Sequence, residues 1–292
     1  MRVLLLFPVT WKTLLFRKTL LIPPTKNPAI ISNKAMEYFV DGNSIVRKIW
    51  GKGDTILFIF AGTSAEFALS KAVDWLYFTG KLPADPLGRL FSTVTYSRRM
   101  VFSEKEAARK AIDKINTIHI AVETNRQAKI PDRAHGDVLF MLIHYSIAAY
   151  DVLEEKLTME EKEAVFEVFR RFGTQMNLKG LPENYSDWAT MRQEPLRDDM
   201  VNSAYTKDLY VQYKKHLGTA RFILLLQTQI LVLPQAAKEQ LSLGRFSWLK
   251  PGLAVYKVFR KIHLDGLLKS IILPRAYKQE IRELDVSDTG YK

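Results

Sequence analysis

Apolar residues recur every three or four positions along most of the chain, and this period predicts helices. The run 55–78 is apolar on nearly every side, so we expect it to be a buried central helix capped by Asp54. Gly62 marks a point of close contact within it. The nearest approach to a strand pattern, 54–60, is too short to be distinguished from a buried helix.

Capping side chains precede the other periodic runs. Each expected helix begins after a Ser, Asp or Thr, in this order: Ser44 before 45–50, Ser103 before 104–123, Asp137 before 138–157, and Thr158 before 159–173, which Gly173 ends. Further helices are expected over 182–200, over 209–234, and after Pro234 and Pro251. No repeat or interior linker divides the chain. These patterns predict one all-α domain.

The two ends differ from the middle in composition. Residues 1–24 mix leucines and aromatics with Lys and Arg, which is typical of an amphipathic segment that lies on a membrane surface or docks on its own domain. Prolines and cations interrupt this stretch before it reaches the roughly 20 apolar residues of a membrane span. We therefore expect an amphipathic segment over 1–24, a helical domain over 25–277 and a charged tail over 278–292.

Composition removes several classes of site. The chain has 292 residues and no cysteine, so disulfides, thiolate nucleophiles, iron–sulfur clusters and zinc fingers are excluded. Its formal net charge of +12 predicts either an anionic partner surface or simply a solvated basic surface. Because the cations are scattered along helices and no nucleic-acid motif is present, we do not expect a nucleic-acid partner.

Four polar side chains fall among apolar ones. Arg89 and Thr93 lie one helical turn apart, and burying them requires a partner that offsets their desolvation. His119 and His144 each lie on an apolar helix face, where a histidine is either a hydrogen-bonded core residue or a ligand of a buried iron cofactor. Zinc-protease, phosphate-loop, dinucleotide and di-iron motifs are absent.

Ordered segments of the chain resemble a known family. The runs "AGTSAEFALSKAVDWLYFTG", "DPLGRLFST", "INTIHIAVE" and "DVLFMLIHYSIAAYDVL" resemble, in order and spacing, the catalytic domains of the bacterial latex clearing protein, a rubber oxygenase, and of the fungal endoplasmic-reticulum oxygenase of mycophenolic acid biosynthesis. The resemblance covers roughly residues 40–240. It implies a large helical domain of the latex-clearing-protein type with a buried cofactor pocket.

The resemblance also implies site residues. His119 would be the proximal iron ligand of haem b, and Arg89 and Thr93 would face the haem pocket and orient dioxygen. His144 matches the second histidine of the family, which would support the haem; a core histidine is the alternative. The chain departs from the family pattern at Asn116, Glu123, Ser92 and Phe78-Thr79, and no position corresponds securely to the general base of rubber cleavage, Asp74 being the nearest carboxylate. These departures count against rubber as the substrate.

The resulting hypothesis is a haem b-dependent oxygenase with iron bound by His119, acting on an apolar, unsaturated or prenylated small molecule with dioxygen. The alternative is a non-catalytic helical protein that binds haem or lipid at a membrane surface. We expect a cytoplasmic protein, peripheral at the membrane through residues 1–24.

Overall fold

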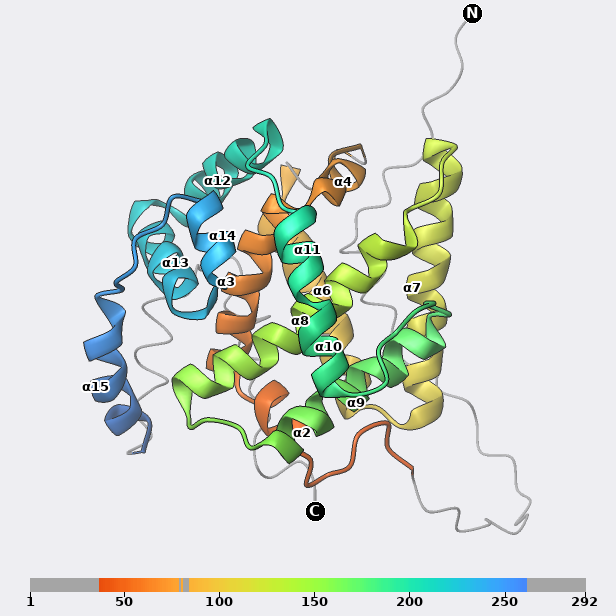
Figure 1. The fold of residues 1–292 in the computed structure, drawn as a ribbon, viewed down its shortest axis with the longest axis horizontal. Coiled ribbons are helices and arrows are strands. Elements are labelled where there is room, and N and C mark those ends of the chain that lie inside the picture. The colour runs from red at the N-terminus through yellow and green to blue at the C-terminus, as the bar shows by residue number, and fades with distance from the viewer. Residues whose placement is uncertain (1–36, 79, 81–83, 262–292) are drawn as a thin grey trace, which may run out of the picture. The chain divides into compact units, whose positions relative to one another are not determined.

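The computed structural model describes residues 37–78, Gly80 and residues 84–261 (Figure 1). Every regular element in that part is a helix, with two isolated bridges, Tyr38–Glu104 and Ser70–Met200. The all-α prediction is therefore confirmed, whereas the predicted end segments 1–24 and 278–292 lie outside the described residues. The helices are α2 (Ile45–Trp50), α3 (Gly53–Leu69), the 3-10 helix η1 (Lys71–Val73), α4 (Asp74–Phe78), α6 (Pro86–Phe102), α7 (Lys105–Arg126), α8 (Asp132–Leu153), α9 (Met159–Gln175), α10 (Tyr185–Met191), α11 (Gln193–Asp198), α12 (Ala204–Leu217), α13 (Thr219–Val232), α14 (Gln235–Gln240) and α15 (Leu249–Lys261).

Helix α3 is the centre of the described helices. It packs against α8, α13, α2 and α6, as Figure 1 shows, and this explains why its sequence is apolar on nearly every side. The close contact predicted at Gly62 is confirmed, since a Cβ atom there would lie 2.1 Å from Cδ1 of Tyr145 on α8. The absence of a side chain at Gly62 thus lets α3 and α8 approach each other.

Helix α8 is apolar and long, and among the described residues it alone is long and apolar enough to cross a membrane. However, 61% of its most apolar window is buried inside the protein. That burial is what a core helix shows, and the contacts of α8 with α3, α9 and α13 supply it.

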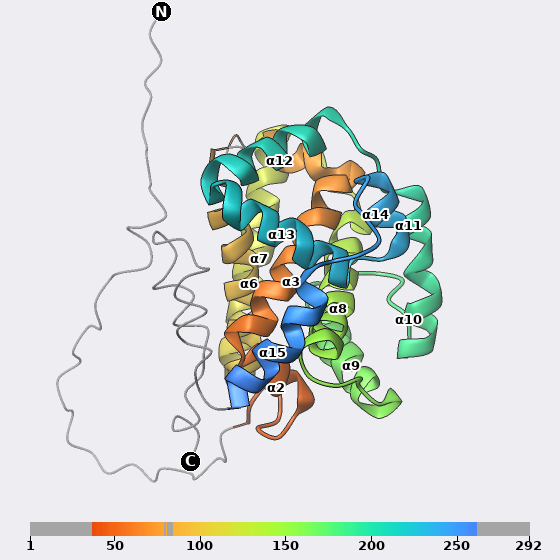
Figure 2. The ribbon, with the colours of Figure 1, turned by 90° about the vertical axis from the view of Figure 1, so that its left-hand side faces the viewer.

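Helices α6 and α7 form an antiparallel hairpin that Figure 2 shows side by side. Asp85 caps α6 by accepting a hydrogen bond from the Gly88 N–H at 2.9 Å, and Pro86 occupies the first turn. Two residues join α6 to α7, so positions equally distant from the turn lie at the same level. This register places Arg89 level with Ile118, the residue before His119.

The sequence prediction made the central helix nine residues longer than it is. It ends at Leu69 instead of Phe78, and η1 and α4 follow as separate short elements. The reason is tertiary: the Val201 N–H donates to the Leu69 carbonyl at 2.7 Å, and the Lys71 N–H donates to the Asp199 carbonyl at 2.9 Å. These bonds hold the chain at Ser70 in an extended conformation that interrupts the helix.

Other boundaries also differ from the prediction. Helix α8 begins at Asp132, so Asp137 is a buried residue within it and not its cap. Helix α9 begins with the predicted cap, Thr158, which forms a reciprocal capping box with Glu161, but continues past Gly173. Ser44 caps α2 as predicted. The remaining differences are that Asp54 lies in the first turn of α3 and is not its cap, which is Lys52, that Glu104 and not Ser103 precedes α7, that residues 182–200 form α10 and α11, and that Gly218, with φ 73°, separates α12 from α13.

Candidate functional site

His119 lies on α7 and is half-buried. Its imidazole stacks on that of His135, in the first turn of α8, with ring centroids 4.6 Å apart and ring planes at 34°. Burial lowers the pKa of His135, while the carboxylates of Glu123 and Asp132 oppose the shift. His135 is therefore neutral near pH 7. The ring that it contacts is His119, which the sequence predicts to be the iron ligand.

His144 lies elsewhere on α8. It follows His135 by nine residues, which corresponds to about 13 Å along the helix and about half a turn around it. Its ring makes an edge contact with Tyr145, at 4.9 Å between centroids and 88° between planes, and it hydrogen-bonds the backbone of Val232 on α13. The structure thus directs His144 toward α13 and not toward His119.

The environment of His144 keeps it uncharged. Burial lowers its pKa to about 4, the Arg192 guanidinium acts in the same direction, and Glu66 and the bond with Val232 oppose the shift. A neutral ring near pH 7 suits both a core histidine and a residue that supports a cofactor pocket.

The predicted polar pair lies on one helix. Arg89 and Thr93 are one turn apart on α6, in agreement with the sequence. Thr93 is half-buried, and its backbone carbonyl accepts a hydrogen bond from Oγ of Ser97 at 3.2 Å. The side chain of Arg89 lies outside the part of the chain that the structure describes, so its orientation stays a prediction.

Arg126 lies two helical turns after His119, on the same face of α7. Nη2 of Arg126 is 2.8 Å from Oδ2 of Asp74, and the guanidinium lies 3.9 Å over the ring of Trp75. Its other terminal nitrogen, Nη1, is buried with no hydrogen-bond partner among the described residues. Asp74 is consequently engaged in an ion pair, while Nη1 of Arg126, on the same helix about 10 Å from His119, has no acceptor among the described residues.

The side chains available to bind a metal favour a cofactor in which the metal is already coordinated by an organic ring. No group of three His, Asp or Glu side chains in the described ranges is placed to hold a bare metal ion. Haem needs one imidazole from the protein, which His119 could supply, and cationic donors for its carboxylates, of which Nη1 of Arg126 could be one. These residues would suit haem better than a free ion.

An ionic cluster lies in the core between α3, α8 and α11. Arg192, 1% exposed, donates from Nη2 to both carboxylate oxygens of Glu66 at 2.6 and 2.5 Å, and the Tyr145 hydroxyl donates to Glu66 at 2.6 Å. Nearby, burial raises the pKa of Asp137 to about 6, with the Asp199 carboxylate as the next contribution. Sequence reasoning missed this cluster, although a carboxylate within so apolar a helix as α3 signals a buried partner.

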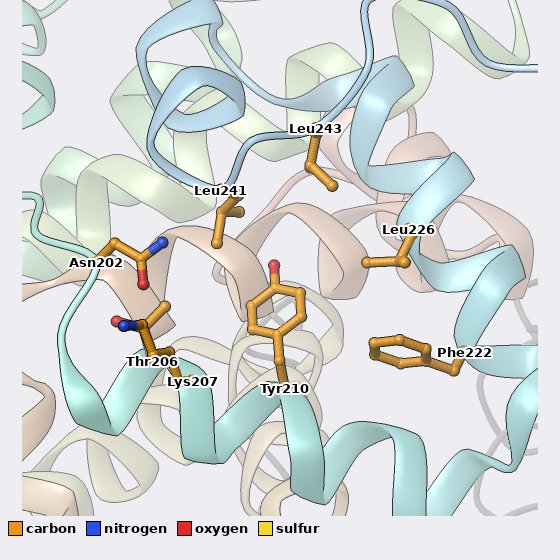
Figure 3. Close-up of a pocket in the computed structure, with 8 residues that line it drawn as sticks. All are labelled: Asn202, Thr206, Lys207, Tyr210, Phe222, Leu226, Leu241 and Leu243. Atoms are coloured by element: carbon orange, nitrogen blue, oxygen red, sulfur yellow. The ribbon is translucent and has the colours of Figure 1, made fainter.

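Among the pockets lined by described residues are two that differ in size. The larger, of about 280 Å³, is formed by Asn202, Thr206, Lys207, Tyr210, Phe222, Leu226, Leu241 and Leu243 (Figure 3). In that view the three leucines, Phe222 and Tyr210 surround one space and the polar residues lie at one end. The smaller, of about 10 Å³, adjoins Glu66 and Asp137 and has room for about one water molecule. Neither contains Thr93, His119 or His144.

Comparison with known proteins identifies the family. A sequence model described as "ER-bound oxygenase mpaB/B'/Rubber oxygenase, catalytic domain" matches residues 50–262, which contain every predicted site residue. No curated protein and no solved structure matches the chain. The family match agrees with the resemblance found in the sequence and with the helical fold. The chain therefore belongs to the ER-bound oxygenase mpaB/rubber oxygenase catalytic-domain family and is an oxygenase, whose reactants are dioxygen and a small molecule.

Proposed function

We propose that this oxygenase uses haem b, held by His119, to oxygenate an apolar small molecule that carries a double bond or a prenyl group. The observation that carries the proposal is the pairing on one face of α7: a half-buried imidazole at His119 and, two turns away, a buried guanidinium nitrogen of Arg126 without a partner. Haem b would supply a redox-active iron with which dioxygen can react.

The residues of this chain would position the reactants. Thr93 has a hydroxyl donor on α6, and Arg89 lies one turn before it, level with Ile118, the residue before His119, if the hairpin is regular. Donors placed there would orient dioxygen and stabilise negative charge that develops on it. Arg126 would bind a cofactor carboxylate. His144, a neutral ring that faces α13, would support a pocket at His119 only indirectly, through the packing of α8 on α13.

The proposed substrate class rests on the family, which includes a rubber oxygenase, an enzyme named for an unsaturated hydrocarbon. An apolar molecule of this kind would be seated by aliphatic and aromatic side chains. We also propose that the enzyme works in the cytoplasm, peripheral at a membrane through residues 1–24, where apolar substrates accumulate.

The absorption spectrum of the purified protein tests the cofactor. Wild-type protein is expected to show a Soret band, and His119→Ala is expected to lose it while keeping its helical circular dichroism. His216→Ala is the matched control, because His216 is an exposed histidine on α12 and its removal should leave the band unchanged. A colourless wild type that does not take up added haem, or a Soret band that survives in His119→Ala, would refute the proposal.

Turnover tests the roles on α6. Thr93→Val removes the hydroxyl at nearly constant volume, so it is expected to retain the Soret band and slow dioxygen consumption by about tenfold or more. Equal consumption by variant and wild type would remove Thr93 from the reaction while leaving the cofactor assignment untouched.

A further inference from the structure

In the segment 245–250 the large apolar side chains are exposed and a small polar side chain between them is buried. Phe246 is 69% exposed and Trp248 is 53% exposed, whereas Ser247 between them is only 3% exposed. Burying a serine while leaving two aromatic rings in water is the reverse of what the hydrophobic effect favours. The two rings therefore form a surface that a partner would cover.

The backbone of this segment is held in place. The Trp248 N–H donates to Oε1 of Gln227 on α13 at 3.1 Å, and the Lys250 N–H donates to the Ser247 carbonyl at 3.1 Å. Ile223, 44% exposed, lies one turn before Gln227 on the same face of α13. The aromatic rings are thus displayed by an anchored segment next to a further exposed apolar side chain.

Helix α15 extends this surface. Tyr256 and Lys257 attach the helix to the protein, the tyrosine hydroxyl donating to Oδ2 of Asp54 at 2.9 Å and the Lys257 ammonium to the Glu154 carbonyl at 2.9 Å. Val255 is 57% exposed. Figure 1 shows α15 at the edge of the described helices, next to α13. We define the aromatic-basic face by its six exposed residues: Ile223, Arg245, Phe246, Trp248, Lys250 and Val255.

The charge of this region is strongly positive. Residues 201–261 contain ten lysines and arginines but only two carboxylates, Asp208 and Glu239. Arg245 and Lys250 flank the two aromatic rings, and the described residues offer neither of them an ion pair. A surface that combines exposed aromatics with unpaired cations is complementary to an interface that is apolar beneath an anionic layer.

We propose that the aromatic-basic face docks on a lipid bilayer that contains anionic lipids. Trp248 and Phe246 enter the headgroup region, and Arg245 and Lys250 contact lipid phosphates and carboxylates. A nucleic acid would also bind the cations of this face, but it offers no apolar surface for the side chains of Ile223 and Val255. A bilayer can bury both of these aliphatic side chains. This contact is separate from residues 1–24 and does not depend on the proposed cofactor.

Vesicle flotation of the full-length protein tests this surface. Wild-type protein is expected to float with vesicles of phosphatidylcholine mixed with phosphatidylserine and to float much less with phosphatidylcholine alone. Phe246→Ser with Trp248→Ser is expected to lower the partition coefficient by about tenfold or more. Arg245→Glu with Lys250→Glu is expected to abolish the preference for phosphatidylserine.

The control variant carries the same kind of change on other helices. Ile120, 61% exposed on α7, and Met159, 65% exposed on α9, replaced together by serine, should leave flotation unchanged. The proposal is overturned if wild-type protein floats with neither vesicle, if the Phe246/Trp248 variant floats like the wild type, or if an RNA oligonucleotide binds the face and the vesicles do not. Protein with a Soret band that fails to float rejects this face alone, whereas colourless protein that floats rejects the haem proposal alone.

Discussion

The imidazole of His119 on α7 is stacked on the imidazole of His135 on α8, with 4.6 Å between ring centroids. The two residues come from helices that the chain joins through residues 127–131, and this ring contact connects the start of α8 to α7. If His119 is an iron ligand, His135 is the side chain that holds its ring in position.

Replacing His135 tests that positioning role. His135→Ala removes the ring contact and is expected to weaken haem binding by about tenfold, the effect typical of losing a residue that orients a ligand. His135→Phe restores a flat ring and should recover most of the affinity. Titration with haem, followed by Soret absorbance, measures both; identical affinities for wild type and the alanine variant would assign the contact no role.

Replacing Gly62 or Gly136 by alanine is expected to change the stability of the protein in opposite directions. In Gly62→Ala the new methyl group would overlap the Tyr145 ring, which cannot move freely because its hydroxyl is bonded to Glu66. We expect a loss of about 3 kcal/mol in the free energy of unfolding. In Gly136→Ala nothing lies within 4 Å, so the gain in helix propensity should stabilise the protein by about 0.5–1 kcal/mol. Urea denaturation measures both, and a neutral Gly62→Ala would contradict the close packing of α3 on α8.

The buried pair of Glu66 and Arg192 predicts non-additive stabilities. Arg192→Met leaves an unpaired carboxylate in the core and is expected to cost about 3–5 kcal/mol. Adding Glu66→Gln removes that charge and retains an acceptor for the Tyr145 hydroxyl, so the double variant should be more stable than Arg192→Met alone. Denaturation of the two single variants and the double variant forms the test; simple additivity would show that the two groups do not interact.

Asp137 predicts a pH dependence of stability. Burial raises its pKa in the folded state to about 6, above the usual value of 3.8 that the unfolded chain retains. Stability from this group is therefore complete below about pH 4 and is lost as the pH rises through 6. Asp137→Asn should consequently be more stable than wild type at pH 8, by about 2–3 kcal/mol, and equal to it at pH 3.5.

The control for this effect is Asp113→Asn, because Asp113 is an exposed aspartate on α7. Its stability should follow that of the wild type at every pH. Thermal unfolding between pH 3.5 and pH 8 measures the three proteins. If Asp137→Asn tracked the wild type across that range, the carboxyl group would not be protonated preferentially in the folded state.

Several features could be predicted from sequence because they are local. The helical period is a property of neighbouring turns, and it identified the elements that form the core. The caps at Ser44 and Thr158 depend on residues within three positions of the helix start, and both are confirmed. The glycine at 62 was identified because an apolar helix without a side chain at one point implies a close neighbour. The ordered motifs also led to the family, which the match over residues 50–262 confirms.

Other features depend on residues far apart in the chain, and the tertiary structure alone decided them. The end of α3 at Leu69 is set by backbone bonds to Val201, and no pattern near Leu69 announces that partner. The partner of Glu66 is 126 positions away at Arg192, and His119 meets His135 and not His144. The sequence by itself determined which segments are helical, apart from the end of α3, and that a polar residue among apolar ones needs a partner. Only packing decided which of those residues meet, because burial requires a partner for each charge without specifying where in the chain that partner lies.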